Sequence, residues 1–167
     1  MKRFNLFSIL LLTLLFSFIF LLFRYYQLGQ ENLTILNQIS TEEQKKTVTI
    51  NSIIIPVEIV NTQEKWKRGL SYRDSLDPNS GMLFDFGQKD IKFPFWMKDM
   101  RFPIDIIFIN DGKIIKIHKD VPAPAPDTPD PKLPYYISED VYDYVLEVNA
   151  GFSEKNMIKE GDGATLN

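Results

Sequence analysis

The sequence predicts a mainly β domain of the α+β class, a compact antiparallel β-barrel or sandwich with one or two short helices, preceded by a single N-terminal transmembrane helix. Three observations predict this architecture. The chain begins with an uninterrupted apolar run, short β-branched and aromatic runs follow beyond residue 46, and an Asp-Gly pair separates two of those runs. We therefore divide the chain into an anchor over residues 1–26, a polar spacer over residues 27–46 and a globular β-rich domain over residues 47–167.

The anchor is predicted from the run Phe4 to Phe23, which contains no charged residue. As a helix rising about 1.5 Å per residue, these roughly 20 residues would cross the hydrocarbon layer of a bilayer. The run ends in bulky residues instead of the small residues of a cleavage site, which favours a retained anchor over the alternative of a cleaved signal peptide. Lys2 and Arg3 outweigh the lone Arg24, so we expect a single pass through the cytoplasmic membrane, with the N-terminus inside and the domain on the extracytoplasmic side. The spacer has few apolar residues and is expected to be partly helical.

The composition bounds the function classes. With 44% hydrophobic residues, including 13 Phe, the domain has enough apolar mass for its own core. The absence of cysteine excludes disulfides, thiolate metal sites and catalysis by a thiol. The net charge of −3 and the lack of a basic patch give no indication of nucleic-acid binding. The first expected partner is the membrane, through residues 4–23.

The first elements of the domain are expected from residue 48 onward. The runs VTI and IIIPVEIV flank a turn at residues 51–52, which predicts a hairpin or a bent pair of strands, with Pro56 at a sheet edge or a bulge. A short helix follows, capped by Asn61 or Thr62 and interrupted near its end by Gly69.

Three further runs are too short for a typical helix and are predicted as strands, namely residues 81–86, 93–97 and 104–110. The pair at residues 111–112, Asp-Gly, predicts a tight hairpin between IDIIFIN and KIIKIHK. In KIIKIHK, the alternation predicts Ile115 and Ile117 on one face of the sheet and Lys116 and His118 on a solvated face.

The last third of the chain begins with six prolines between Pro122 and Pro134, which predict a stiff surface loop. A further strand is expected over residues 142–148. Ser153 is expected to cap a helical stretch that Gly161 ends, and residues 164–166 are expected to close the sheet.

The common catalytic and cofactor constellations are missing from the sequence. His118 is the only histidine and is expected at the surface, so no nucleophile and base pair is available around it. No spacing typical of a metal site and no glycine-rich phosphate loop occurs. We therefore expect no catalytic, cofactor or metal residues of these kinds.

A polar cluster embedded in the aromatic strands is the remaining candidate site. Two arginines near each other could bind an anion such as a carboxylate, phosphate or acidic sugar. The favoured alternative is that they pair inside the fold with two carboxylates. The aromatic run around Trp96 either crosses a core or exposes a ring to a ligand. The candidate residues are Arg68, Arg73, Asp105, Glu147 and Trp96, with Lys98 beside them.

Five segments together resemble a known family. WKRGLSYR, GMLFDF, FPFWMKDMRFPIDIIFINDGKII, VLEVNAG and EGDGATL, in this order, are similar to the family called domain of unknown function 192 over roughly residues 48–166. The resemblance implies a compact, mainly antiparallel β domain, commonly exported or membrane anchored, without an assigned activity. The matching positions, none with an assigned catalytic role, are Arg68, Gly69, Leu70, Arg73, Gly81, Met82, Phe84, Trp96, Met97, Asp105, Glu147, Gly151 and Gly161.

Three functions are compatible with these observations. The first is a non-catalytic binding or envelope-interaction module with an envelope glycan or a membrane protein as partner. The second is an enzyme acting on cell-envelope carbohydrate, with Asp105 and Glu147 as acid and base. The third is a structural partner of another membrane protein.

Overall fold

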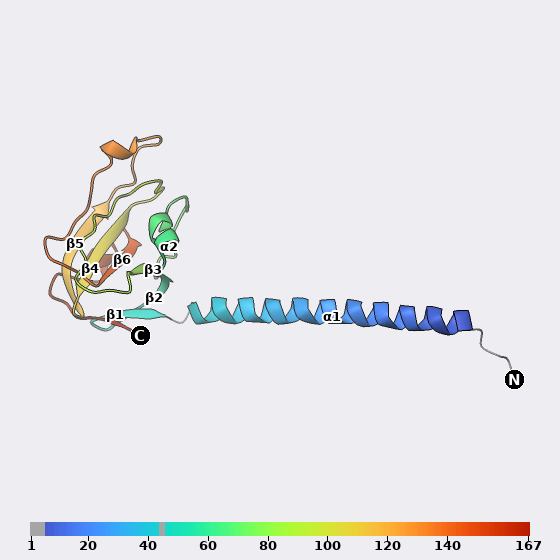
Figure 1. Ribbon diagram of the computed structural model, residues 1–167. Coiled ribbons are helices and arrows are strands. Elements are labelled where there is room, and N and C mark those ends of the chain that lie inside the picture. Colours follow the sequence, from blue (N-terminus) through green and yellow to red (C-terminus); the bar gives the residue numbers. More distant parts are fainter. Residues whose placement is uncertain (1–5, 44–45) are drawn as a thin grey trace. The chain divides into compact units, whose positions relative to one another are not determined.

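The computed structural model describes residues 6–43 and 46–167, with side chains over residues 9–36 and 46–167. The chain divides into two units, Met1–Glu42 and Glu43–Asn167. Figure 1 shows the elements of both units along the sequence. Each unit is described by itself.

The first unit is the helix α1 (Leu6–Glu43). The helix extends through most of the predicted spacer, which the sequence predicted to be only partly helical, because Gln, Glu and Leu in this stretch all favour helix. Among the described residues, Ile9–Leu36 is long and apolar enough to cross a bilayer, a test that an N-terminal signal sequence also passes. The apolar side chains of this stretch are exposed. Phe4, Lys2 and Arg3, on which the predicted span and orientation also rest, lie outside the described residues.

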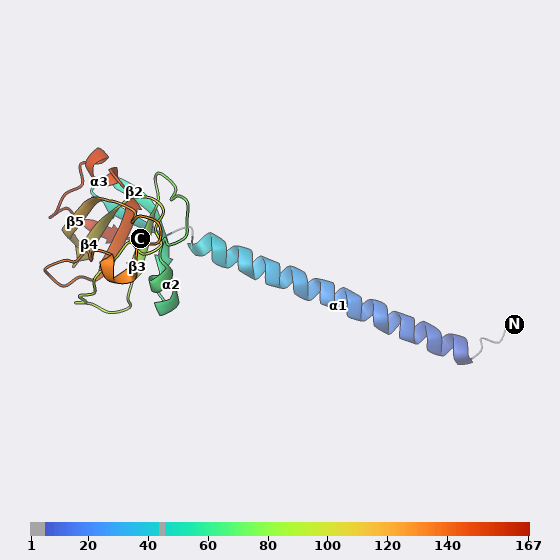
Figure 2. The same cartoon turned by 90° about the horizontal axis from the view of Figure 1, so that it is seen from above.

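The described part of the second unit contains one curled sheet. Its strands are β1 (Thr47–Ile50), β2 (Ile53–Val60), β3 (Gly81–Asp85), β4 (Ile104–Asn110), β5 (Lys113–Val121), β6 (Tyr144–Asn149) and β7 (Ala164–Leu166). Their spatial order is β5-β4-β6-β3-β2-β1-β7. The two edges meet where Lys113 bridges Gly163 and the N–H of Ile114 donates to the carbonyl of Asp162 at 2.9 Å. The sheet therefore curls into a barrel-like form (Figure 2), and the predicted mainly β class is confirmed.

One pair of strands departs from the predicted antiparallel arrangement, because β2 and β3 are parallel. The helix α2 (Gln63–Arg68) forms the crossover between them, as a parallel pair requires. Thr62 caps this helix by accepting from the N–H of Lys65, and Gly69 ends it, both as predicted. Up to Pro56, β2 pairs with β1, and from Val57 onward it pairs with β3. Pro56 therefore lies where β2 changes partner, a position at which the missing N–H of a proline is tolerated.

The predicted Asp-Gly hairpin joins β4 to β5, and Asp111 and Gly112 both have positive φ, 44° and 69°, as a tight turn of this type requires. The predicted alternation in β5 is wrong at one position. A register shift opposite Phe108 and Ile109 makes Ile115 a bulged residue, so Ile115 and Ile117 pack against different cores instead of sharing one face.

Two other elements differ from the prediction. Residues 93–97 do not form a strand of the sheet, because Phe95 makes only an isolated bridge to Tyr136. The short helix α3 (Phe152–Lys155) has Gly151 as its N-cap, so Ser153 lies inside the helix instead of capping it, and the helix ends before Gly161. The predicted Pro-rich loop, drawn in orange in Figure 1, contains only the 3-10 helix η1 (Asp130–Lys132).

Two hydrophobic cores lie on opposite faces of the sheet. The inner core fills the curled sheet and takes residues from all seven strands, namely Val48, Ile55, Leu83, Ile107, Ile114, Leu146 and Ala164 among others. The outer core lies between the other face of β3, β4 and β6 and the segments that cover it, and includes Leu70, Phe84, Phe95, Met97, Ile106 and Tyr142. Both cores belong wholly to the second unit, so this unit has the interior it needs to fold without α1.

Candidate functional site

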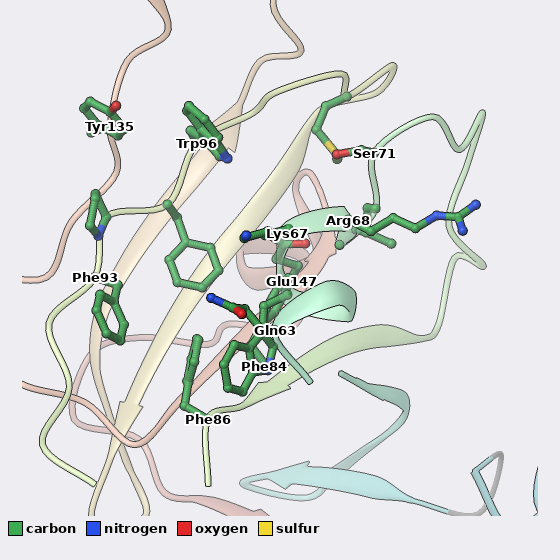
Figure 3. A pocket seen from close by; sticks show the side chains of 16 residues that line it. Gln63, Lys67, Arg68, Ser71, Phe84, Phe86, Phe93, Trp96, Tyr135 and Glu147 are labelled. Atoms are coloured by element: carbon green, nitrogen blue, oxygen red, sulfur yellow. The ribbon is translucent and has the colours of Figure 1, made fainter. Parts of the chain in front are cut away.

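A cavity of about 460 Å³ opens into the outer core between α2 and the segment before β4. We call it the aromatic pocket, because aromatic side chains dominate its lining. Its lining residues are Gln63, Trp66, Lys67, Arg68, Gly69, Leu70, Ser71, Phe84, Phe86, Phe93, Pro94, Phe95, Trp96, Met100, Tyr135 and Glu147. Figure 3 shows the rings arranged around this space.

The inner wall of the aromatic pocket is fixed by backbone hydrogen bonds and by ring packing. The indole N–H of Trp66 donates to the carbonyls of Val60 at 2.8 Å and Asp85 at 3.1 Å, which holds α2 against the ends of β2 and β3. Phe84 and Phe95 pack edge to face, with ring centroids 5.1 Å apart. Gly69 lets the end of α2 lie close to the Phe84 ring, because a Cβ at this position would be only 3.2 Å from the ring.

The segment opposite α2 is held in place by a buried tyrosine. The hydroxyl of Tyr142 accepts from the N–H of Phe93 at 3.0 Å and donates to the carbonyl of the same residue at 2.7 Å. This pair of bonds fixes the backbone of Phe93 while its ring stays 52% exposed. The residue is therefore positioned by the core but presented to solvent.

An aromatic shelf at the mouth of the aromatic pocket consists of Phe93, Trp96 and Tyr135. Trp96 and Tyr135 are stacked, with centroids 6.1 Å apart and planes inclined by 14°. The ammonium group of Lys98 lies 5.5 Å from the centroid of the Trp96 ring, within the range of a cation–π contact. Trp96, predicted to be either core or ligand-facing, is 39% exposed and lines the pocket.

Glu147 is the buried polar group of the aromatic pocket. It lies on β6 between Met82 of β3 and Ile106 of β4, and is only 5% exposed. Its carboxyl makes no hydrogen bond or ion pair with any other residue that the structure describes. Burial alone raises the pKa of Glu147 to about 8, because the surroundings disfavour the charged form. Near neutral pH this carboxyl is therefore largely protonated.

Asp105 is fully buried on the other face of the sheet. It is paired with Val148, whereas Glu147 is paired with Ile106, and residues one position apart on a strand point to opposite faces. The Asp105 carboxylate accepts from the N–H groups of Asp120, Gly151 and Ser153 at 2.9, 3.2 and 2.9 Å. Asp105 and Glu147 therefore cannot act on one substrate as acid and base, which removes the predicted carbohydrate-cleaving pair.

The predicted pairing of the arginines with these carboxylates is also wrong. Arg73 instead makes a two-point ion pair with Glu58, at 2.8 and 2.9 Å. Arg68 is exposed, and in Figure 3 its guanidinium group points away from the aromatic pocket. Arg68 at the end of α2 and Arg73 in the loop after it reach surface carboxylates or water more easily than the interior of the sheet. Inside the sheet, backbone N–H groups lie nearer to Asp105 than either arginine does.

The two remaining charged candidates have structural partners. Lys98 pairs with Asp130 of η1 and so ties the Pro-rich loop to the segment before β4. His118 is half-buried instead of lying free at the surface. Its Nε2 is 2.8 Å from the carbonyl oxygen of Ile137, and its ring packs edge-on against Phe108. Within residues 9–36 and 46–167, no group of three His, Asp or Glu side chains could hold a metal ion.

The sequence did not indicate most of the aromatic pocket. Gln63 and Lys67 lie on α2. Phe84 lies near the end of β3, Phe86 directly follows that strand, and Phe93 lies in the segment that the sequence predicts as a strand. In Figure 3, the polar ends of Gln63 and Lys67 point toward the cavity. The high density of Phe and Trp between residues 66 and 96 was the only available signal, and it does not distinguish a core from a pocket.

Two solved structures share this fold. One is a protein of Sinorhizobium meliloti 1021, provisionally described as a transcription regulator, with 31% identity, a TM-score of 0.63, and coverage of 74% of this chain and 95% of that chain. The other is a protein of unknown function from Novosphingobium aromaticivorans DSM 12444, with 27% identity, a TM-score of 0.61, and coverage of 72% and 82%. None of the curated proteins matches this chain.

The family comparison agrees with the resemblance seen in the sequence. The model of the DUF192 family, described as "Uncharacterized ACR", matches residues 45–166, which is almost the whole of the β-rich unit and well over half of the chain. This chain therefore belongs to the domain of unknown function 192 (DUF192) family.

Proposed function

We propose that this protein is a non-catalytic, small-molecule-binding module that α1 holds at the extracytoplasmic face of the cytoplasmic membrane. The observation that carries the proposal is the aromatic pocket, whose lining combines exposed rings at the mouth with an unpartnered buried carboxyl. A cavity of about 460 Å³ with an apolar lining and few polar groups has the size and character of a small-molecule site. An exposed aromatic shelf beside such a cavity is typical of a surface that a ligand covers.

A binding role is favoured over catalysis by the charges around the aromatic pocket. Glu147 is the only buried ionisable side chain in its lining, since Lys67 and Arg68 are exposed. General acid–base chemistry of the hydrolytic kind needs a second positioned group beside the first. The described lining offers no such buried partner for Glu147.

The membrane placement rests on α1. Its apolar part lacks a small-residue cleavage site, and its exposed Leu, Ile and Phe side chains suit a lipid environment. The test is an alkaline carbonate wash of membranes that contain the full chain, together with protease treatment of intact spheroplasts. We expect the protein to stay in the pellet and the domain to be digested from outside; release by carbonate, or protection from the protease, would contradict the placement.

The binding site can be tested with a neutral fluorescent probe, N-phenyl-1-naphthylamine. Both tryptophans of the chain, Trp66 and Trp96, line the aromatic pocket, so energy transfer from tryptophan to the probe reports binding, and the variants below locate it. We expect saturable binding to residues 46–167 and at least a fivefold weaker affinity in Phe93→Ala. Ile137→Ala is the matched control, because Ile137 is 51% exposed but does not line the pocket. Equal loss in both variants, or no saturable binding, would reject the site.

A further inference from the structure

The unpartnered carboxyl of Glu147 restricts the ligand. The other buried acid of the sheet, Asp105, has three backbone donors, whereas Glu147 has none among the described residues. Burial without a partner is unfavourable for a carboxylate, so a group that supplies a positive charge and hydrogen-bond donors at this point gains a strong interaction.

The rings that line the same cavity as this carboxyl favour a cation too. Seven aromatic side chains line the same cavity, namely Trp66, Phe84, Phe86, Phe93, Phe95, Trp96 and Tyr135. The face of an aromatic ring carries partial negative charge and attracts ammonium groups, most strongly where water is excluded. The parts of these rings that do not contact the ammonium group offer an apolar surface to the hydrocarbon part of a ligand.

The polar groups are too few for a carbohydrate. The hydroxyl of Ser71 already donates to the carbonyl of Lys98 at 2.8 Å, and Arg68 points away. Gln63, Lys67, Glu147, the Tyr135 hydroxyl and the Trp96 indole N–H remain, whereas a sugar ring presents a hydroxyl on almost every carbon, each of which loses water on entry. An anionic ligand would be opposed by Glu147 whenever this group is ionised, and the charge of Lys67 is weakened by its exposure to water.

We propose, as an extension that rests on the proposed function, that the aromatic pocket binds a small molecule with a protonated amine on an apolar skeleton, with the ammonium group at the Glu147 carboxylate. The rings then surround the ammonium group and the adjoining hydrocarbon. Gln63 and Lys67, both on α2, contact the end of the ligand nearer to solvent.

This arrangement couples binding to a proton. The charged or titratable groups that line the same cavity as Glu147 are Lys67, Arg68 and Tyr135, and the neighbouring strands contribute the uncharged Met82 and Ile106. In the free protein the carboxyl holds its proton up to about pH 8. An ammonium ligand must displace that proton, so its affinity should rise by nearly tenfold per pH unit from pH 6 to about pH 7.5 and level off above about pH 8.

Three probes of similar shape test the inference: 2-phenylethylamine, 2-phenylethanol and 3-phenylpropionate. Residues 46–167 are suitable for the test because both cores lie within them, and tryptophan fluorescence reports pocket occupancy. At pH 8.5 we expect the amine to bind at least tenfold more tightly than the alcohol and the carboxylate. At pH 6 this preference should largely disappear.

Glu147→Gln keeps the size of the side chain and removes its charge. We expect this variant to lose the preference for the amine and its pH dependence while still binding 2-phenylethanol. Glu58→Gln is the matched control, since it removes an exposed carboxylate outside the aromatic pocket and should leave the preference unchanged. Circular dichroism and urea unfolding establish that both variants are folded.

The outcomes separate the two proposals. Binding of the alcohol or of N-phenyl-1-naphthylamine without any preference for the amine would overturn the inference and keep the pocket as a binding site. Tighter binding of 3-phenylpropionate at low pH would also overturn it, in favour of an anionic ligand that hydrogen-bonds to the protonated carboxyl. Absence of binding by every probe would reject the proposed function itself.

Discussion

Each face of the sheet carries a hydrophobic core and one buried acid, but the two acids have different surroundings. The inner core is mostly aliphatic, and its buried acid, Asp105, accepts from three backbone N–H groups. The outer core is richer in aromatic residues and opens into the aromatic pocket, and its buried acid, Glu147, has no partner among the described residues. The two acids lie on neighbouring strands, so the difference comes from what covers each face. On the inner face the acid is held by the fold itself, whereas on the outer face the acid lines the aromatic pocket, where we propose that a ligand binds it.

The largest effect expected from this comparison is that of Asp105→Ala. The substitution leaves three N–H groups without their acceptor, that of Ser153 buried and those of Asp120 and Gly151 partly buried, and a buried unsatisfied donor costs about 1–3 kcal/mol. We expect a loss of about 5 kcal/mol in the free energy of unfolding, measured by urea titration of residues 46–167 at pH 7. Glu147→Ala is the control on the other face and should cost much less. A smaller loss for Asp105→Ala than for Glu147→Ala would reverse the roles assigned to the two acids.

The second effect concerns the pH dependence of stability. The pKa of Glu147 is about 8 in the folded protein and 4.5 for an ordinary glutamate. Between these values the folded state holds a proton that the unfolded state releases, so this group's contribution to stability falls as pH rises. From pH 5 to pH 8 the loss should be on the order of 3 kcal/mol, at roughly 1.4 kcal/mol per unit. Glu147→Gln should remove this slope, as measured by urea titrations at both pH values. An equal slope in the variant would exclude Glu147 as its source.

A third prediction tests how closely the inner core is packed. A Cβ at Gly81 would lie 2.8 Å from Cδ1 of Leu146 and 2.9 Å from the carbonyl oxygen of Glu147. Gly81→Ala should therefore force β3 and β6 apart and cost about 1–3 kcal/mol in thermal or urea unfolding. Gly163→Ala is the control, because nothing lies within 4 Å of a Cβ at that position. Similar stability of the two variants would show that the inner face has room to adjust.

The smallest effect on stability is expected at the mouth of the aromatic pocket. Phe93 and Trp96 are 52% and 39% exposed, so replacing either with Ala should cost less than about 1 kcal/mol while weakening probe binding severalfold. Differential scanning calorimetry and the fluorescence titration measure the two quantities on the same samples. A large loss of stability with unchanged binding would place these rings in the core.

The sequence predicted well those elements whose signals are local. The Asp111-Gly112 turn, the Thr62 cap and the β-branched runs each specify their own conformation, and all three occur as predicted. The parallel pairing of β2 with β3 was missed, because it depends on where α2 packs and not on the residues of either strand. The strand predicted at residues 93–97 was wrong for a similar reason. The alternation there has strand character, but Tyr142 and the other rings fix the segment as a wall of the aromatic pocket.

The partners of the buried acids were beyond the reach of the sequence. Arg68 and Arg73 carry the right charge for Asp105 and Glu147, and only the folded chain shows that Arg73 pairs with Glu58 and that backbone donors reach Asp105. By itself the sequence determined the apolar N-terminal helix, the mainly β class and the family, because composition, local turns and ordered motifs carry that information. The tertiary structure alone decided which acid is satisfied and which faces a cavity. Asp105 is paired with Val148, the residue after Glu147, and this offset of one residue places the two acids on opposite faces of the sheet. Segments distant in the sequence then determine what covers each face.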